Sequence, residues 1–185
     1  MNNTKTWACL LLPLWLSSAL HAEEMTSHGS HVHGEATLTF VLDGNEAEVA
    51  LVTAAGNIVG FEHQPKTAEQ QQKLQQQLQM LRSGDWFVVD TAAGCKVSSH
   101  DVRSEQQDEH QHGHTEGHTE GHTEGHADVY ANLQLLCQHP LQLKQLQLAL
   151  TTLATGVETI KLQWLIDGEA GAAELNKNNN QLKLR

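Results

Sequence analysis

The chain has 185 residues, with 22 acidic and 11 basic side chains and a formal net charge of −11. This acidic balance argues against a partner that is nucleic acid or an anionic membrane surface. The same shortage of cations suits a protein that binds metal ions, although many acidic proteins bind none.

Residues 1–22 are typical of a secretory signal peptide. Lys5 supplies a positive charge, Trp7–Leu16 is an apolar core, and small residues before Ala22 suit cleavage after that position. The alternative is a membrane anchor, but this apolar core is about half of the roughly 20 residues that cross a bilayer. We therefore expect an exported chain without stable membrane insertion.

Residues 23–103 are expected to form a first α+β half. Composition and turn signals predict a hairpin, then a helix with Thr67 as N-cap and Gly84 at its end, then two more strands. The predicted strands are Ala36–Leu42, Glu46–Ala54, Trp86–Asp90 and Cys95–Val102.

Two histidines precede the first of these strands, at His31 and His33, and Glu35 follows them. If the chain is extended there, both rings project to the same side, roughly 6.5 Å apart at the backbone. This spacing suits two ligands of one metal ion. His63, before the predicted helix, is a candidate third ligand or an ordinary surface histidine.

The segment HQHGHTEGHTEGHTEGH holds six histidines, in a unit Thr-Glu-Gly-His that occurs three times. Neutral imidazole is the commonest metal ligand among side chains, and short His-rich tracts are typical of metal binding. The glycines predict a mobile loop over residues 104–127 rather than a rigid cage, and the alternative reading is a solvated linker. The candidate ligands here are His110, His112, His114, His118, His122 and His126.

Two cysteines, Cys95 and Cys137, remain after the signal segment and flank the His-rich tract. An exported chain allows a disulfide between them, which would fix the two bases of the loop and contribute a few kcal/mol. The rival reading makes one or both thiolates zinc ligands, but no CxxC spacing is present. We favour the disulfide.

Residues 128–185 are expected to form a second, mainly β half that begins with the strand Val129–Cys137. Asp128 follows His126 as Glu35 follows His33, and both carboxylates are candidate metal ligands beside these histidines. Similar elements come after each pair. We therefore predict an α+β fold of two related small antiparallel sheets, each with a helix, joined by the flexible His-rich loop.

Several motifs together resemble the ZrgA family of zinc-regulated, zinc-binding periplasmic proteins: HVHGEATL, FEHQP before a capped helix, and the tract leading into a strand that ends at Cys137. The resemblance implies a periplasmic location and zinc acquisition, with zinc passing towards a high-affinity ABC importer. It implies that His31, His33, the tract histidines and His126 are ligands. His100 and His139 match no motif.

No enzyme motif such as HExxH, a nucleophile elbow or a P-loop is present, so we expect no catalysis. Three binding functions stay open: a zinc carrier in uptake, a buffer or detoxifier for zinc, copper or nickel, and an adhesion module with an incidental tract. Imidazole sites prefer copper to zinc when both are free, so sequence leaves the metal open.

Overall fold

Every second side chain of strand β1 (Glu35–Asp43) is buried, because residues on one face of a strand recur with a period of two. The same alternation continues in β2 (Glu46–Ala54), which pairs antiparallel with β1 along its length. The turn between them contains Gly44, which has a φ of 60° and therefore favours glycine. The predicted hairpin is confirmed.

The computed structural model describes residues 32–106 and 126–184. After the hairpin the described elements, in chain order, are α1 (Ala55–Val59), α2 (Ala68–Ser83), β3 (Phe87–Val89), the 3₁₀ turn η1 (Thr91–Ala93), β4 (Cys95–Gln106), β5 (Ala127–Cys137), the 3₁₀ turn η2 (Pro140–Gln142), β6 (Gln145–Leu148), α3 (Leu150–Leu153), β7 (Thr159–Ile166), β8 (Glu169–Asn176) and β9 (Gln181–Lys183).

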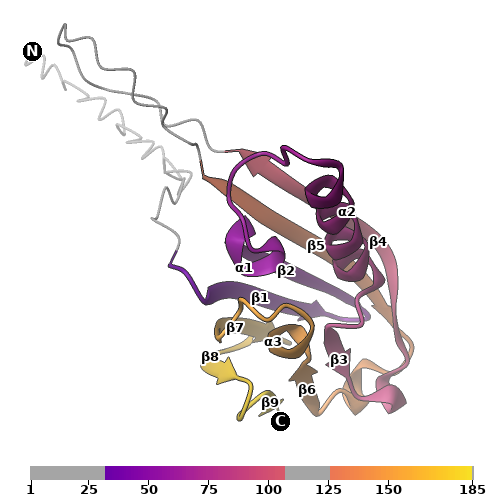
Figure 1. The fold of residues 1–185 in the computed structure, drawn as a ribbon. Coiled ribbons are helices and arrows are strands. Elements are labelled where there is room, and N and C mark those ends of the chain that lie inside the picture. The colour runs from indigo at the N-terminus through magenta and orange to yellow at the C-terminus, as the bar shows by residue number, and fades with distance from the viewer. Residues whose placement is uncertain (1–31, 107–125, 185) are drawn as a thin grey trace, which may run out of the picture.

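Six of these strands form one sheet in the order β4-β5-β2-β1-β7-β8, and three form a small sheet in the order β3-β6-β9. All pairs are antiparallel except β1 with β7, which run parallel. Figure 1 shows the helices and the three-stranded sheet on one side of the six-stranded sheet. The α+β class with mainly antiparallel sheets is as predicted.

The expected separate sheet in each half is wrong, because the large sheet contains three strands from before residue 107 (β1, β2 and β4) and three from after it (β5, β7 and β8). The reason is the free edge of the β1–β2 hairpin. A two-stranded hairpin leaves unpaired backbone groups on its outer edges and buries little apolar surface. Strands β5 and β7 pair with those edges from the later part of the chain, and β1 becomes a central strand.

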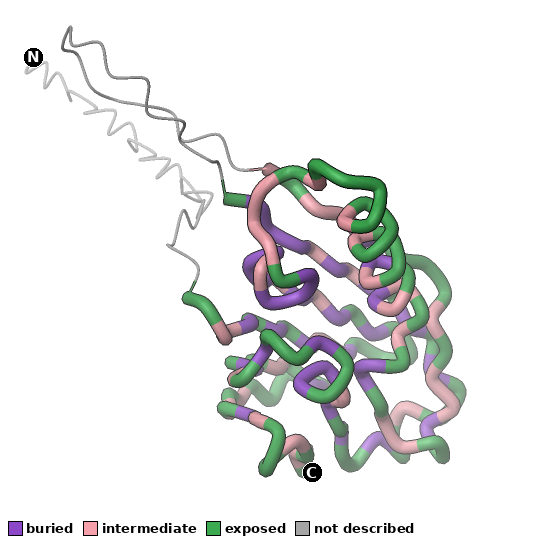
Figure 2. The backbone as a smooth tube through the Cα atoms, viewed as in Figure 1, coloured by how far each residue is buried: buried purple, intermediate pink, exposed green. Residues whose placement is uncertain are grey.

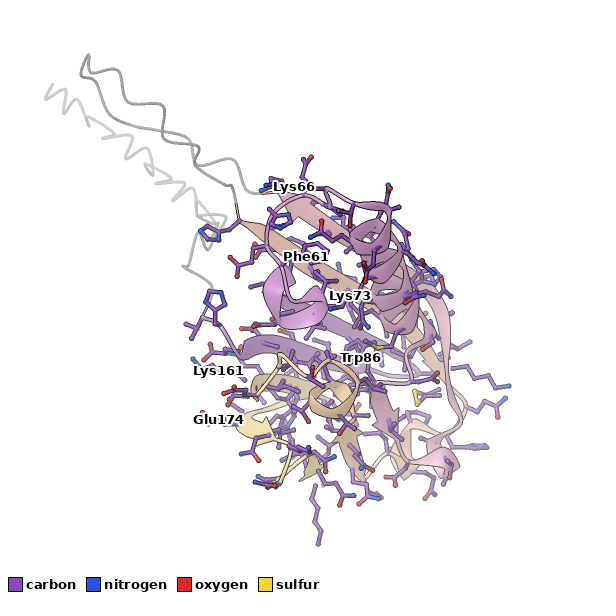
Figure 3. The ribbon with its side chains drawn as sticks, in the orientation of Figure 1. Phe61, Lys66, Lys73, Trp86, Lys161 and Glu174 are labelled. Carbon is purple, nitrogen blue, oxygen red and sulfur yellow. A yellow bond between two sulfur atoms is a disulfide. The ribbon has the colours of Figure 1, made fainter. Side chains whose placement is uncertain are left out.

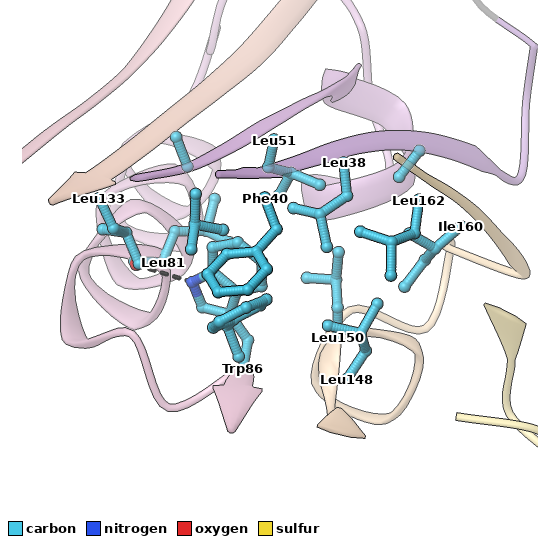
Figure 4. Close-up of a cluster of buried hydrophobic side chains, with 14 of the residues drawn as sticks. Leu38, Phe40, Leu51, Leu81, Trp86, Leu133, Leu148, Leu150, Ile160 and Leu162 are labelled. Carbon is cyan, nitrogen blue, oxygen red and sulfur yellow. Dashed lines mark hydrogen bonds between the residues drawn. The ribbon is translucent and has the colours of Figure 1, made fainter. Parts of the chain in front are cut away.

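The core lies between the large sheet and the elements that cover it. Trp86 is fully buried beside Leu81, and its indole N–H donates to the Leu81 carbonyl at 2.8 Å (Figure 4). The rings of Phe40 and Phe87 lie 5.2 Å apart between their centroids. Figure 2 shows buried positions alternating with exposed ones along the large sheet, whose outer face is covered by no other described element.

Helix α2 begins and ends as its sequence predicts. The Thr67 hydroxyl accepts the Gln70 N–H at 3.1 Å, and the Gln70 side chain accepts the Lys66 N–H at 2.8 Å. Gly84 ends the helix with a φ of 78°. Leu78 and Leu81 are buried and Leu74 packs against the core, so the leucine stripe faces inward.

Cys95 and Cys137 form the predicted disulfide, directly opposite each other in the β4–β5 pair. Its expected place is wrong, however. The residues that flank the His-rich segment, Gln106 and Ala127, pair at the other end of the same two strands. With a rise of about 3.3 Å per residue, the disulfide lies on the order of 35 Å from the segment it was expected to clamp.

Replacing both cysteines, Cys95→Ala with Cys137→Ala, should lower the free energy of unfolding by about 2–4 kcal/mol, because the bridge closes a long loop in the unfolded chain. The measurement is urea denaturation with and without reductant. The expected metal affinity should change less than about twofold, since the bridge and the root of the His-rich segment are at opposite ends of the strands. A larger loss of metal affinity in the folded variant would contradict this placement.

Asp90 ties the segment after β3 to the start of β6. Its Oδ2 accepts the backbone N–H of Lys144 at 2.7 Å and that of Gln145 at 2.9 Å. The hydrogen bond from Lys144 is the main reason that the pKa of Asp90 lies below its ordinary value. A carboxylate that accepts backbone N–H groups is favoured in its charged form.

The Asp90→Asn variant should be less stable than the parent chain at pH 7. The gap between the free energies of unfolding of the two chains should narrow as the pH falls. A carboxyl whose pKa is lowered by folding stabilises the folded state above its unfolded pKa, about 3.9, and this contribution disappears as pH drops through the folded pKa. Urea midpoints of both chains at pH 7, 5 and 3 measure the gap. A gap that stays constant down to pH 3 would show that the charge of Asp90 contributes nothing.

Candidate functional site

One end of the large sheet gathers the elements that sequence analysis singled out. Strand β4 ends there at Gln106, β5 begins there, and the two residues pair in register. Strand β1 also begins at this end, and β2 ends there. In Figure 1 both segments drawn in grey join the described chain at this end. The start of β1, the end of β4 and the start of β5 therefore lie at the same end of the sheet.

Two histidines from distant parts of the chain meet at this end on one carboxylate, that of Glu62. The Nε2 atom of His33 lies 2.7 Å from Oε1 of Glu62, and Nδ1 of His126 contacts Oε2. His33 lies two residues before the start of β1, and His126 closes the His-rich segment just before β5. We call these three side chains the His–Glu–His cluster.

Glu62 is the least exposed member of this cluster. Its side chain is 19% exposed, against 77% for His33 and 64% for His126. It lies over α1, where a Cβ on Gly56 would be 3.0 Å from Oε1 and 3.1 Å from Cγ of Glu62. The absence of a side chain at Gly56 therefore gives the Glu62 carboxylate the room to reach both rings.

Imidazole N–H groups that donate to a carboxylate present their other nitrogen as a lone pair when the ring is neutral, and metal-binding histidines are commonly oriented in this way. Nitrogen and carboxylate oxygen are both zinc ligands. Within residues 32–106 and 126–184, no three His, Cys, Asp or Glu side chains stand ready around a common point. A metal ion at the cluster would either bind the other ring nitrogens while Glu62 orients both rings, or replace a contact that Glu62 now makes.

His33 lies in a turn and not in an extended strand. The Glu35 N–H donates to the Val32 carbonyl at 3.0 Å, and Gly34 has a φ of 82°. The condition under which the rings of His31 and His33 would share one side is therefore not met. His31 itself lies outside the described residues, as do the predicted ligands His110, His112, His114, His118 and His122 and the predicted signal segment.

Two other predicted ligands within the described residues, Glu35 and Asp128, have contacts with residues outside the cluster. Glu35 forms an ion pair of 2.8 Å with Lys161 of β7, on the part of the molecule where Figure 3 labels Lys161 and Glu174. Asp128 is buried in β5, with Oδ2 3.4 Å from the Tyr130 hydroxyl. Both carboxylates lie at the same end of the sheet as the His–Glu–His cluster.

His63 turns away to a neighbouring pocket. Its ring stacks on Phe61, with 5.3 Å between centroids, and its Nδ1 lies 2.7 Å from the Gln64 carbonyl oxygen. Figure 3 shows Phe61 beside α1. The pocket has a volume of about 120 Å³ and is lined mainly by apolar side chains, with Ser104 and Gln106 of β4 on one wall. The adjacent residue, Glu62, is the one that contacts His33 and His126.

Glu62 was therefore missed in the sequence, although it stands in the same FEHQP motif as His63. A single glutamate carries no periodic or spacing signal, whereas a histidine draws attention as a metal ligand. The available signal was the loop itself, because Glu62 stands beside a candidate ligand in a short connection after α1.

A second charged group lies on the exposed face of β4, near the root of the His-rich segment. The Arg103 guanidinium contacts Asp101 and Glu105 at 2.5 Å each and lies 5.1 Å from the ring centre of Tyr130. The hydrogen bond to Glu105 is the largest of the effects that raise the pKa of Arg103. These carboxylates therefore already have a cationic partner, unlike the carboxylate of the His–Glu–His cluster, whose described contacts are two imidazoles.

Comparison with protein families finds a match over residues 30–184 to the model described as ZrgA family zinc uptake protein. The matched range includes both histidines of the cluster, Glu62 and the complete His-rich segment. The comparison with curated proteins found no match. In the described part of the chain, no helix is long and apolar enough to cross a membrane.

The variant Gly56→Ala should disturb the cluster without unfolding the protein. The added methyl group approaches the Glu62 carboxylate to 3.0 Å, so the carboxylate must shift by a few tenths of an ångström. Imidazole ¹H–¹⁵N NMR correlations of His33 and His126 should move, while those of His139 stay in place. Gly44→Ala is the control, since it costs about 1 kcal/mol through its left-handed backbone but touches nothing within 4 Å. Unchanged His33 and His126 signals in Gly56→Ala would contradict the contact.

Proposed function

Because the chain belongs to the ZrgA family of zinc uptake proteins, we propose that it binds zinc in the periplasm and passes it towards a high-affinity zinc ABC importer. In this proposal the His-rich segment collects zinc, and the His–Glu–His cluster holds one ion at the root of that segment. The observation that carries the proposal is the meeting of His33 and His126 on Glu62.

The donor chemistry of the cluster fits zinc as cargo. Two imidazoles and a carboxylate make a nitrogen and oxygen set that zinc accepts, and a further ligand from the adjacent sequence or water would complete four-coordination. Glu62 acts either as a direct ligand or as the carboxylate that orients both rings. The cluster is built without cysteine or methionine, the soft ligands that favour Cu(I). These features support zinc ahead of Cu(I), and the family match supports zinc as the cargo.

The position of the cluster supports transfer from the collecting segment. His126 is both the last histidine of the repeated unit and a member of the cluster. An ion bound by the repeat therefore needs no new encounter with the fold, because the repeat leads into the cluster by way of the peptide chain. Such tethering raises the effective concentration of one site near the other.

The exposure of both rings supports release to a partner. His33 and His126 are more than half exposed, so another protein can reach the ion. A catalytic zinc instead needs fixed ligands and an open position in a pocket that excludes water. We therefore propose a binding and delivery function without catalysis. The Cys95–Cys137 disulfide, together with the secretory sequence of residues 1–22, supports an oxidising compartment such as the periplasm.

Calorimetric zinc titration tests the proposal in chains expressed from Glu23. In one chain, which we call the tract-Gln chain, the five tract histidines from His110 to His122 are replaced by glutamine and the length of the segment is kept. This chain should retain about one zinc ion. Adding His33→Ala, His126→Ala or Glu62→Gln should weaken that ion by about 10–100-fold.

His139→Ala is the matched control, because His139 lies next to η2 and is exposed but remote from the cluster. Its affinity should stay within about twofold of the parent value. If the tract-Gln chain binds no zinc, the cluster is not a site, and a buffering function of the repeat for zinc, copper or nickel takes the place of this proposal.

A further inference from the structure

A buried polar side chain, Asn57 of α1, holds the backbone on which His33 is mounted. Asn57 is 3% exposed. Its Oδ1 accepts the N–H of Gly34 at 2.8 Å, and its Nδ2 donates to the carbonyl of Glu35 at 3.0 Å. One amide thus binds the two residues that directly follow His33, as a donor to one and an acceptor from the other.

A second buried side chain completes this arrangement. Thr53 is 1% exposed, and its hydroxyl donates to the same Glu35 carbonyl at 2.8 Å while it accepts from Asn57 Nδ2 at 2.9 Å. Buried polar groups are costly unless all are paired, so a closed set of hydrogen bonds such as this one specifies a single geometry. The backbone at Gly34 and Glu35 is therefore fixed relative to β2 and α1.

The turn before β7 also contacts the backbone at Gly34. The Gly34 carbonyl accepts from Glu158 N at 2.7 Å and from Thr159 N at 2.9 Å. A Cβ on Gly156 would lie 2.5 Å from the carbonyl oxygen of Asn57, so only glycine fits in that turn. The turn before β7 closes over the α1 backbone at Asn57, and Gly34 is held from two sides.

We infer that Asn57 is a positioning residue for zinc, which fixes the turn at Gly34 so that the His33 ring meets Glu62. Glu62 follows the same helix α1 closely in the chain, so α1 carries the carboxylate and also sets the direction of the histidine that pairs with it. This inference rests on the proposed zinc site. According to this inference, Asn57 contributes measurably to zinc affinity although it is buried and is not itself a ligand.

A double-mutant cycle in the tract-Gln chain tests the inference. Asn57→Ala should raise the zinc dissociation constant about 10-fold or more, as the loss of an orienting partner does in other metal sites. In a chain that already carries His33→Ala, the same substitution should change affinity less than about twofold, because the residue that it positions is gone. Thr53→Val, which keeps the shape of the side chain, should give a smaller loss of the same kind.

The matched control for stability is Trp86→Phe. It removes the buried hydrogen bond from the Trp86 indole N–H to the Leu81 carbonyl of α2. Thermal unfolding identifies conditions in which this control and Asn57→Ala are both fully folded. The control should bind zinc within about twofold of the parent chain. If Asn57→Ala does not fold, Thr53→Val carries the same cycle with His33→Ala.

The outcomes separate the inference from the function on which it rests. If His33→Ala leaves the affinity of the tract-Gln chain unchanged, the cluster does not bind zinc and the proposed function fails first. If His33→Ala weakens binding but Asn57→Ala does not, the cluster stands and the positioning role is overturned. An equal effect of Asn57→Ala with and without His33 overturns it as well, because the loss would then be independent of that ring.

Discussion

The site depends on the register of strand pairing in the large sheet. Gln106 pairs with Ala127 and Ala54 with Asp128, while Ala36 pairs with Thr53 and Ile160. These pairs place the end of β4, the start of β5 and the start of β1 at the same end of the sheet. Because a slip of one residue would turn every side chain to the opposite face, the buried alternation of β1 and β5 fixes this alignment. His33 and His126 are brought together by the sheet, before any metal is present.

The local elements of the fold were predictable from short patterns. The hairpin β1–β2 follows from alternation around Asp43–Asn45, and α2 follows from its capping residues and leucine stripe. The order of the strands was not predictable in the same way. Parallel pairing of β1 with β7 joins residues more than a hundred positions apart, and nothing in the composition of either strand names its partner. The faint similarity between His33-x-Glu35 and His126-x-Asp128 suggested two sheets. In the structure, the strands that follow these two motifs, β1 and β5, belong to one sheet and start at the same end of it.

For the candidate site, residue type was the useful signal and it was incomplete. His33 and His126 were predicted as ligands because His33 belongs to an HxH pair before a strand and His126 ends the His-rich tract. Glu35 and Asp128 were expected beside them, but strand geometry turns these carboxylates to Lys161 and Tyr130. Glu62 and Asn57 carry the arrangement instead. Their importance comes from the path of α1 and its following loop, which is a property of the packed chain.

The paired ends of β4 and β5 have a consequence for how this protein can vary. The segment that they enclose spans about 20 residues, and one more Thr-Glu-Gly-His unit would make it about 24, at a loop-closure cost of only a few tenths of a kcal/mol. The ladder on either side would be unaffected, since its last pair is Gln106 with Ala127. Repeat number is therefore free to drift by duplication or loss of whole units. Under the proposed function, genetic change can alter the ion-gathering capacity of the chain in steps of one histidine, without any need to refold the domain.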